Sequence, residues 1–421
     1  MLTERHLHYI WSNRLFDRLT IADQSVEVVD TGRLNSHDGP DFEMCRLRMG
    51  GMEWIGSVEI HKRSSEWREH RHHLDPLYNT VVLHVVLEDN SPSLDAGGRR
   101  VPTALLSISP RILSHLERLE LSNQSLRCMP EVSALGAVEI LDLALEFLPM
   151  RMEQKLQSLR KRSDSDHYNS IFYLTLMRYL GAHQNNAVME QVAASLPYAY
   201  LKKHASDPKA IEAMLIGQAG LLSEAPRDAY EAQLLEEYRF YRQKFDLTPI
   251  DKGAFRYLRL RPVSYPPRML GIVAMILHDE ARLMEALTRL DPVEINRCLS
   301  VPPDAYWQSH FDFGRELPSP TGGLGRQTLR SLIINAVIPT VYYYAGQTAD
   351  RRLAQSAIDW LYLLPAERNQ YLRLFEQNGI TPRHAADTQA LLQLYHNYCR
   401  PMHCLRCPIS ARYFQYLRQS D

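Results

Sequence analysis

The sequence predicts an α+β protein in which a small N-terminal domain of helices and strands (residues 1–125) precedes a larger, mostly α-helical domain (residues 126–421). Up to about residue 110, short segments alternate apolar and polar residues with the two-residue period of β-strands. Beyond that point, apolar residues recur with the period of helices, and proline-rich joints separate the segments. The length of 421 residues is typical of two or three domains.

The N-terminal domain is expected to run in the order helix, three strands, short helix and strand. The expected elements are a helix at 2–16, strands at 26–30, 41–49 and 54–61, a short helix at 75–78 and a strand at 81–87. Thr3 suits the N-cap of the first helix, and Gly50-Gly51 suits the hairpin turn between the second and third strands. The last strand, VVLHVVL, is rich in β-branched residues and almost continuously apolar, which is typical of a central strand.

The helical domain is expected from nine segments with helical periodicity. These segments cover residues 112–121, 138–159, 171–181, 211–222, 230–245, 269–290, 329–341, 353–364 and 388–398. No fixed-period repeat recurs among them, so the sequence does not predict a solenoid.

Composition and charge narrow the class of protein. Hydrophobic residues make up 45% of the chain and charged residues 23%, which is typical of globular proteins. The net charge of -1 gives no general attraction to nucleic acid, so any anion-binding surface must be local. The N-terminus has no apolar signal segment, and the most apolar stretch (332–345) is too short to span a membrane. We therefore expect a cytoplasmic protein that is not embedded in a membrane, with its six cysteines as thiols or metal ligands.

Two acidic residues on neighbouring strands form the first candidate site. Side chains alternate along a strand, so Glu59 and His61 point to the same side of the sheet. Asp41 follows Pro40 at the start of the preceding strand, and the hairpin brings Asp41 close to Glu59. Because converging carboxylates repel, we expect a divalent cation between them, and Mg²⁺ (or Mn²⁺) suits such a pair. Asp41 and Glu59 are therefore the predicted metal ligands.

The pattern Pro40-Asp41 followed by Glu59-x-His61, on this order of helices and strands, resembles the PD-(D/E)xK nuclease superfamily. The resemblance implies a restriction-endonuclease-like fold and a Mg²⁺-dependent nuclease or phosphodiesterase acting on DNA. In that superfamily, a lysine two residues after the glutamate positions the attacking water. Here the position is His61, whose neutral imidazole can accept a proton or bind metal. Asp41, Glu59 and His61 are thus the predicted catalytic residues.

The histidine in place of lysine leaves two alternatives open. One is a non-catalytic nucleic-acid-binding or scaffold protein that retains the nuclease-like fold. The other is a metal-dependent hydrolase for another substrate, which would use the histidine-rich loop at residues 69–75. Imidazoles of this loop either reach the metal or a phosphate, or form a polar turn without a ligand, which we prefer. His84, between apolar neighbours, is interpreted as a core histidine with satisfied hydrogen bonds.

A second resemblance covers nearly the full length of the chain. The motifs GPDF, WxGxVEIHxxSSxW, HxHHxDPxY and VxLHVV lie at residues 39–42, 54–67, 70–78 and 81–86. Together they are similar to the domain-of-unknown-function 2851 family of bacteria. That resemblance implies no established activity, so functional expectations rest on the site residues.

Three cysteines in a nine-residue segment form a second candidate metal site. Cys399, Cys404 and Cys407 can share one metal, but tetrahedral zinc or a four-cysteine iron–sulfur cluster needs a fourth ligand. His396 and His403 are nearby candidates, and the distant Cys128 is the preferred one. The plan of one distant and three clustered cysteines is similar to that of some PD-(D/E)xK exonucleases, which implies a 4Fe-4S cluster or Zn²⁺ here.

Four arginines form a local basic cluster in this otherwise neutral chain. Arg256, Arg259, Arg261 and Arg268 carry the forked guanidinium groups that suit phosphate, and we predict them as nucleic-acid-binding residues. The alternative is a solvated charged face without a ligand. The glycine-rich stretch at 322–325 lacks the Lys-Ser/Thr ending and the preceding strand of a phosphate loop, so it is interpreted as an ordinary loop.

Overall fold

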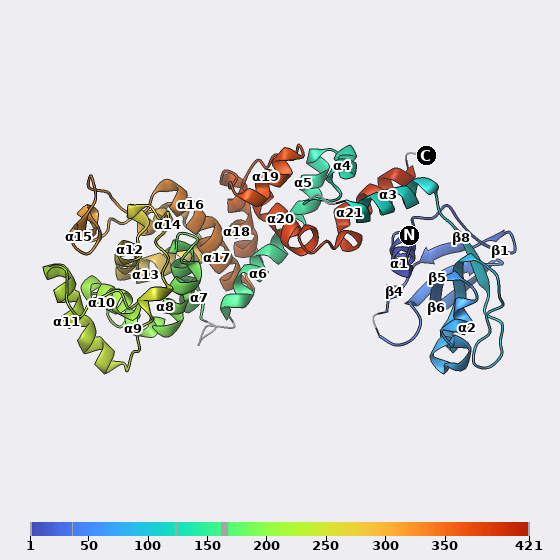
Figure 1. The fold of residues 1–421 in the computed structure, drawn as a ribbon, viewed down its shortest axis with the longest axis horizontal. Helices are drawn as coiled ribbons and strands as arrows, with labels where there is room; N and C mark the ends of the chain where they lie inside the picture. Colours follow the sequence, from blue (N-terminus) through green and yellow to red (C-terminus); the bar gives the residue numbers. More distant parts are fainter. Residues whose placement is uncertain (1, 36, 123–124, 161–166, 420–421) are drawn as a thin grey trace. The chain divides into compact units, whose positions relative to one another are not determined.

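The computed structural model describes residues 2–35, 37–122, 125–160 and 167–419. The chain forms two compact units (Figure 1). The sheet unit comprises residues 1–144, 368–381 and 394–421, and the helical unit comprises residues 145–367 and 382–393. The predicted α+β class is confirmed, since a mixed sheet lies at the N-terminus and the remainder is mostly helical. The division differs from the predicted domains 1–125 and 126–421 because the C-terminal segment groups with the N-terminal residues.

One mixed sheet organises the sheet unit. Its strands are β1 (Arg18–Ile21), β2 (Gln24–Ser25), β3 (Glu27–Asp30), β4 (Arg33–Leu34), β5 (Phe42–Met49), β6 (Met52–Arg63), β7 (Val81–Glu88) and β8 (Thr103–Ser107). Their order is β2-β1-β8-β7-β6-β5-β3, and β4 pairs with β5. β5 and β6 form an antiparallel hairpin, whereas β6, β7 and β8 run parallel to one another. The buried centre of the sheet is therefore β6 and β7, as expected for the apolar 81–87 segment.

Helices contact the central strands of the sheet. α1 (Glu4–Ser12) packs against β6, and its Trp11 lies 6.3 Å from the ring of Phe42 on β5. The connection from β6 to β7 contains α2 (Glu66–Glu69) and the 3-10 turns η1 (His72–Leu74) and η2 (Pro76–Thr80). Trp67 of α2 is fully buried and donates a 2.7 Å hydrogen bond from Nε1 to the carbonyl of Leu94. This connection is thereby held against the strands.

Small helices complete the sheet unit. They are α3 (Pro110–Leu121), α4 (Met129–Val132), η3 (Ser133–Leu135), α5 (Ala137–Leu145), α19 (Gln370–Gln377), the π-helical turn η7 (Tyr395–Cys399), η8 (Cys404–Arg406) and α21 (Pro408–Gln419). The C-terminal α21 packs against α3 and α4, and its Phe414 ring lies 5.7 Å from Tyr9 of α1. Arg412 and Glu139 form a 2.7 Å ion pair. These contacts attach the end of the chain to its beginning.

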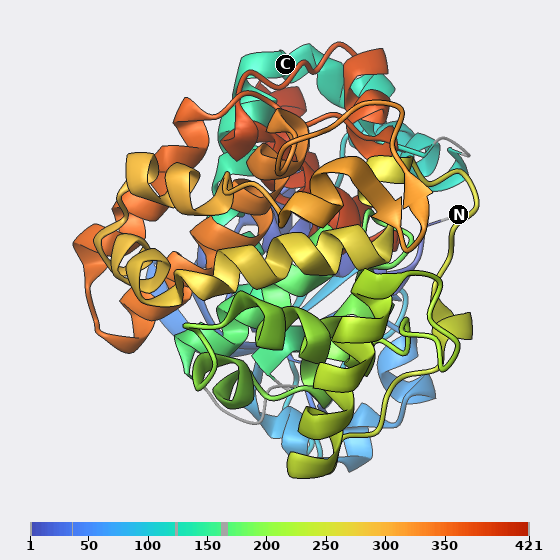
Figure 2. The ribbon, with the colours of Figure 1, turned by 90° about the vertical axis from the view of Figure 1, so that its left-hand side faces the viewer.

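The helical unit encloses the larger hydrophobic core. Its helices are α6 (Leu148–Arg160), α7 (Tyr168–Leu180), α8 (Asn186–Ser195), α9 (Tyr198–Lys202), α10 (Pro208–Gln218), α11 (Ala229–Lys244), α12 (Pro266–His278), α13 (Glu280–Arg289), α14 (Pro292–Leu299), α15 (Ala305–Ser309), α16 (Arg326–Leu332), the π-helical turn η6 (Ile333–Val337), α17 (Ile338–Gln347), α18 (Arg351–Leu363) and α20 (Ala385–Leu394). Short elements also include η4 (Lys252–Ala254), η5 (Pro262–Ser264), β9 (His310–Asp312) and β10 (Arg315–Glu316). Figure 2 shows helices of this unit, such as α10 to α15, in green to orange.

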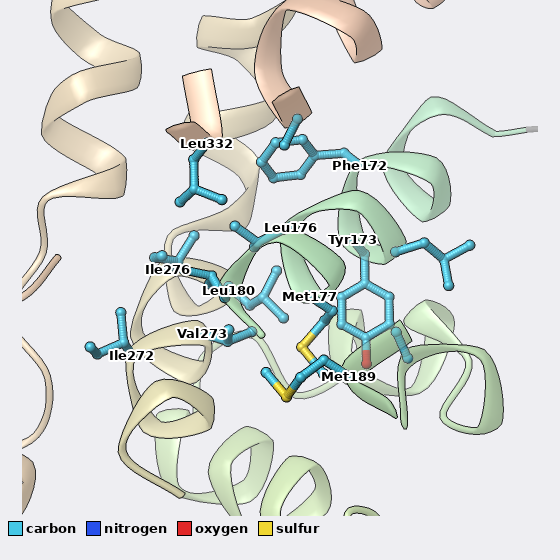
Figure 3. Close-up of a cluster of buried hydrophobic side chains, with 14 of the residues drawn as sticks. Phe172, Tyr173, Leu176, Met177, Leu180, Met189, Ile272, Val273, Ile276 and Leu332 are labelled. Atoms are coloured by element: carbon cyan, nitrogen blue, oxygen red, sulfur yellow. The ribbon is translucent and has the colours of Figure 1, made fainter. Parts of the chain in front are cut away.

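Apolar side chains from α7, α8, α12 and α16 meet at the centre of the helical unit (Figure 3). Figure 3 shows Leu176 and Leu180 of α7 facing Val273 and Ile276 of α12, with Met189 of α8 beside them. All five are buried, so the central helices are apolar on most of their surfaces. None of the described helices has the length and hydropathy that a membrane span requires.

A buried polar group interrupts this core. Glu212 of α10 is 2% exposed, and its carboxylate accepts hydrogen bonds from Trp307 Nε1 at 2.6 Å and from the Tyr230 hydroxyl at 3.0 Å. Burial raises the pKa of Glu212 to about 7, although Lys209 and these hydrogen bonds oppose the rise. The folded helical unit therefore holds a proton on Glu212 that the unfolded chain releases near pH 4.5.

Replacing Glu212 with glutamine is expected to make the helical unit less sensitive to pH. Between pH 4.5 and 7 the folded protein binds more protons at this residue than the unfolded chain, so its contribution to stability falls as the pH rises. The shift corresponds to about 3 kcal/mol at about 1.4 kcal/mol per pKa unit. Denaturant unfolding at several pH values should show the Glu212→Gln variant gaining stability relative to the parent from pH 4.5 to 7.5. A difference that stays constant over this range would contradict the assignment.

Candidate functional site

The structure brings Asp41 and Glu59 together at the β5–β6 hairpin. Phe42 pairs with Val58, so Asp41, just before β5, lies opposite the Glu59 segment. The Asp41 amide donates a 3.0 Å hydrogen bond to Glu59 Oε2, and the Ile60 amide donates a 3.0 Å hydrogen bond to Asp41 Oδ2. The two carboxylates are therefore each oriented by the backbone of the other strand. The antiparallel hairpin expected from Gly50-Gly51 is the cause of this arrangement.

Three histidines converge on the same carboxylate. Glu59 Oε1 lies 3.1 Å from His72 Nε2 and 3.4 Å from His61 Nε2. His61 Nε2 lies 3.1 Å from His70 Nδ1, and one ring nitrogen from each of the three histidines lies within 4.8 Å of the others. We call Glu59, His61, His70 and His72 the histidine cluster.

The spacing of these atoms is that of metal ligands. With metal–ligand bonds of about 2.0–2.1 Å, the corners of a tetrahedron lie about 3.3 Å apart. Three separations between donor atoms of the cluster, of 3.1–3.4 Å, are close to this value, and the three ring nitrogens lie within 4.8 Å of one another. Hydrogen bonds between the same groups would have similar lengths, so the spacing alone permits either a metal or a proton between them. His72 Nε2 favours a metal, because it is buried and its 3.1 Å contact with Glu59 Oε1 lacks the geometry of a hydrogen bond.

Backbone conformation at the loop aims two of the histidines at the site. Arg71 has a left-handed conformation with φ 65° and ψ 22°, which is uncommon for a residue with a side chain. This turn separates His70 at the end of α2 from His72 at the start of η1 and lets both rings face His61. Tyr78 stacks on His72 with ring centroids 3.8 Å apart and fixes its plane. The loop thus adopts a strained turn where the candidate ligands meet.

A chain of hydrogen bonds behind His61 orients its ring. His61 Nδ1 lies 2.9 Å from His84 Nε2, and His84 Nδ1 lies 2.7 Å from the hydroxyl of Ser93. If His61 Nδ1 donates to His84 Nε2 and His84 Nδ1 donates to Ser93, the lone pair of His61 Nε2 points into the cluster, as a metal-ligating histidine requires. His84 is fully buried and hydrogen-bonded, in agreement with its interpretation as a core histidine.

Burial sets the charge of the cluster. Desolvation, followed by the nearby imidazoles, lowers the pKa of His61 to about 2, and desolvation lowers the pKa of His84 to about 3. Desolvation, followed by the charge of Asp41, raises the pKa of Glu59 to about 9. At neutral pH the imidazoles of His61 and His72, whose pKa values burial lowers, are therefore neutral, and Glu59 is a protonated acid. A bound divalent cation would restore the carboxylate and use the neutral imidazoles as ligands.

His8 of α1 is a site residue that sequence reasoning missed. Its Nε2 lies 3.1 Å from Asp41 Oδ2, and the Asp41 carboxylate raises the pKa of His8 above its ordinary value although burial alone would lower it. His8 is partly exposed, unlike His61. The only signal in the sequence was its place on the first helix, one turn after Glu4. For His70 and His72 the sequence leaves open either a metal or phosphate contact or a polar turn without a ligand, and the structure packs both rings against His61.

The four cysteines named from the sequence also come together in the sheet unit. Cys128 precedes α4, Cys399 ends η7, Cys404 begins η8, and Cys407 precedes α21, which packs on α4. All four are free thiols. Burial raises the pKa of Cys128 and of Cys399, and in both cases the charges of Cys404 and Cys407 contribute to the rise. The thiols therefore lie within electrostatic range of one another, but no three of these described sulfur atoms lie within 4.8 Å of one another, and their role as a ligand set stays a prediction.

The four predicted arginines do not form one surface. Arg256, Arg259 and Arg261 are exposed, whereas Arg268 is 2% exposed. Arg268 donates to the carbonyls of Val263, Trp307 and Gly322 and to the hydroxyl of Thr321. Arg268 is therefore held inside the helical unit and does not share an exposed basic surface with the other three arginines. The sequence pattern did not reveal the burial of Arg268, because nearly every residue of α12 is buried and no exposed face marks which positions point inward.

Fold and site together define an α+β protein with a candidate metal centre built on its N-terminal sheet. The chain belongs to the family described as "Protein of unknown function (DUF2851)", whose model matches residues 4–370. No curated protein and no solved structure matches the chain. The resemblance to the PD-(D/E)xK superfamily therefore gains no support from related proteins.

Proposed function

We propose that the histidine cluster is the metal centre of a phosphodiesterase, and specifically of a nuclease acting on DNA. The observation that carries the proposal is the convergence of Glu59, His61, His70 and His72, with Asp41 hydrogen-bonded beside them. An acidic residue before one strand, a Glu-x-His on the next and a following parallel strand give the arrangement similar to the PD-(D/E)xK plan. A restriction-endonuclease-like fold is part of this proposal.

The donor atoms favour a transition-metal ion over the expected Mg²⁺. Mg²⁺ prefers carboxylate and water oxygens in octahedral geometry, whereas imidazole nitrogens suit Zn²⁺ and other first-row transition ions. His61, His70 and His72 would hold the ion, and Glu59 would lie next to its fourth position. Asp41, whose Oδ2 already accepts a hydrogen bond from Ile60, orients Glu59 and His8 instead of serving as a primary ligand. When bound, such an ion lowers the pKa of a coordinated water and polarises a phosphoryl oxygen.

The residues of the chain then have separate roles. Glu59 accepts a proton from the attacking water, because its oxygen lies beside the ligand nitrogens. His61 stays neutral at every pH above about 3 and serves as a ligand, not as the base expected from the sequence. His8 is partly exposed and paired with Asp41, so it can donate a proton to the leaving oxygen.

The second candidate function is a non-catalytic DNA-binding or scaffold protein. The observation that favours it is the closeness of Glu59 Oε1 to two of the three proposed ligand nitrogens, at 3.1 Å from His72 and 3.4 Å from His61, which would let Glu59 act as a fourth ligand. Four protein ligands make a closed, structural metal site, whereas a catalytic site keeps one position open. In that case the bound ion stabilises the sheet unit without turnover.

Cleavage of labelled single- and double-stranded DNA distinguishes the two. We expect cleavage after loading the full-length protein with Zn²⁺ or Mn²⁺, weaker activity with Mg²⁺, and none in excess EDTA. The Asp41→Asn variant should bind metal but cleave at least about 10-fold more slowly. A loss of this size is typical when a residue that orients a metal ligand is removed. Metal binding without cleavage of any substrate would leave only the structural function.

We also propose that Cys128, Cys399, Cys404 and Cys407 hold a 4Fe-4S cluster or a Zn²⁺ ion. Burial raises the pKa values of Cys128 and Cys399, which disfavours their thiolates. A bound metal would stabilise the thiolate form instead. Protein purified without oxygen should contain either a brown chromophore with about four irons per chain or one zinc per chain at this site. The Cys404→Ser variant should lose that metal while Cys298→Ser retains it, since Cys298 lies in the other unit. Equal metal content in both variants would contradict the proposal.

A further inference from the structure

A cavity in the helical unit is lined by a set of charged residues whose balance differs from that of the whole chain. Its volume is about 640 Å³, within the range of small-molecule sites. Its walls come from the end of α7 and the following loop, from residues 261–269, and from the glycine-rich loop at 321–325 leading into α16. All of these segments belong to the helical unit, so the cavity is separate from the histidine cluster.

The lining of the cavity is cationic. Arg261, Arg268 and Arg326 contribute to it, together with His183, and none of the described lining residues is an aspartate or a glutamate. In the chain as a whole, 49 acidic residues balance 48 basic ones. A cavity with three guanidinium groups and no carboxylate is therefore a local excess of positive charge, which the walls of the cavity would focus on an anion inside it.

Arg268 is the buried part of this charge. Its Nε donates to the Trp307 carbonyl at 3.0 Å, and its Nη2 donates to Thr321 Oγ1 at 2.8 Å and to the Gly322 carbonyl at 2.6 Å. Within the described part of the chain it forms no ion pair with a carboxylate. Burying a cation without a counter-charge is costly, and the cost falls if an anion occupies the adjacent cavity.

The remaining two arginines are available to a ligand. Arg261 and Arg326 are exposed, and over the residues that the structure describes neither lies within 4.0 Å of a carboxylate. The glycine-rich loop between Arg268 and Arg326 follows a fixed path, because a Cβ atom on Gly323 would lie 2.4 Å from the Val301 carbonyl oxygen. Arg268 donates hydrogen bonds to this loop, and the loop leads directly to Arg326 at the edge of the cavity.

We propose that this cavity binds a phosphate-bearing anion, with Arg261 and Arg326 as direct contacts and Arg268 as the buried counter-charge. Guanidinium groups bind phosphate oxygens through paired hydrogen bonds, and the hydroxyls of Ser264 and Thr328 in the lining can donate to the same oxygens. The phosphate belongs to a free nucleotide or to the phosphorylated end of a nucleic-acid strand. The glycine-rich loop interpreted from the sequence as an ordinary loop would then form one wall of a binding site.

Calorimetric titration of the full-length protein tests the proposal with four probes: pyrophosphate, ATP, and a ten-nucleotide single strand with either a 5′-phosphate or a 5′-hydroxyl. We expect binding of the phosphate-bearing probes that weakens as salt rises. The R261Q/R326Q double variant should lose at least about 10-fold in affinity, as expected for charged hydrogen bonds. The control is Arg330→Gln, an exposed residue of α16 outside the lining, which should bind within about twofold of the parent.

The probes also identify the source of the phosphate. Tighter binding of ATP assigns the site to a free nucleotide, and tighter binding of the 5′-phosphorylated strand assigns it to a strand end; both support the proposal. Binding of the 5′-hydroxyl strand as tight as that of every phosphate-bearing probe, no binding of any probe, or unchanged affinity in the double variant with an unchanged melting curve would overturn it. Titration is carried out in EDTA, so the result does not depend on the histidine cluster or on cleavage.

Discussion

Replacing Glu59 with glutamine is expected to lower metal-dependent DNA cleavage by at least about 100-fold, the lower end of the contribution of a general base. Glutamine preserves the shape of the side chain and can still accept the hydrogen bond from the Asp41 amide. It cannot accept a proton from water, and it carries no charge to balance a cation. Initial rates on labelled DNA, measured with Zn²⁺ and with Mn²⁺, give the size of the loss.

The Glu59→Gln variant should remain folded. The carboxyl group is 4% exposed and its pKa is raised to about 9, so the metal-free protein already buries it in the neutral form. The neutral amide therefore costs little stability. Glu53→Gln, on the same strand but exposed, is the matched control and should cleave at the parental rate. Parental rates in the Glu59→Gln variant would show that this carboxylate takes no part in the reaction.

The largest loss of stability is expected when Trp307 is replaced with alanine. Trp307 is fully buried, its Nε1 donates to Glu212 Oε1 at 2.6 Å, and its ring lies against Gly271. A Cβ atom at Gly271 would lie 2.4 Å from the indole, so α12 approaches the ring as closely as a glycine permits. Removing a buried tryptophan side chain typically costs about 3–5 kcal/mol, partly from the cavity that remains.

Thermal unfolding followed by circular dichroism measures this effect. For a unit of this size, the loss corresponds to a decrease in Tm of about 6–20 °C. Phe240→Ala is the control in the same unit, because Phe240 is 58% exposed and its replacement should change stability by about 0.5 kcal/mol at most. Similar Tm changes in the two variants would contradict the role assigned to Trp307.

Local sequence patterns predicted one side of the sheet, from β7 to the edge strand β3 expected at 26–30, but not β8, β1 and β2 on the other side. The segments expected at 41–49, 54–61 and 81–87 correspond to β5, β6 and β7, because their periodicity and the Gly50-Gly51 turn are local signals. β1 and β8 were missed. They pair with each other across more than eighty residues of chain, and the two short, partly exposed segments carry no strong pattern of their own. The helix expected at 269–290 ends instead at Asp279, which separates α12 from α13.

The candidate site was predictable to the extent that it depends on strand geometry. Glu59 and His61 share a face because strand side chains alternate, and Asp41 lies beside them because the hairpin is tight. The roles of His70 and His72 depend on the left-handed turn at Arg71, a residue type that gives no sign of that conformation. The position of His8 depends on how α1 packs on the sheet, which no local pattern specifies.

Anomalous diffraction from crystals equilibrated with Zn²⁺ tests the central claim, that the histidine cluster binds a metal ion, most directly. We predict a peak at the zinc absorption edge about 2.0–2.1 Å from nitrogen atoms of His61, His70 and His72, with Glu59 at its fourth side. A water or substrate oxygen bound there supports the catalytic function, and direct Glu59 coordination supports the structural one. Density at saturating Zn²⁺ that shows the three imidazoles hydrogen-bonded to one another, with no anomalous peak between them, would contradict the account.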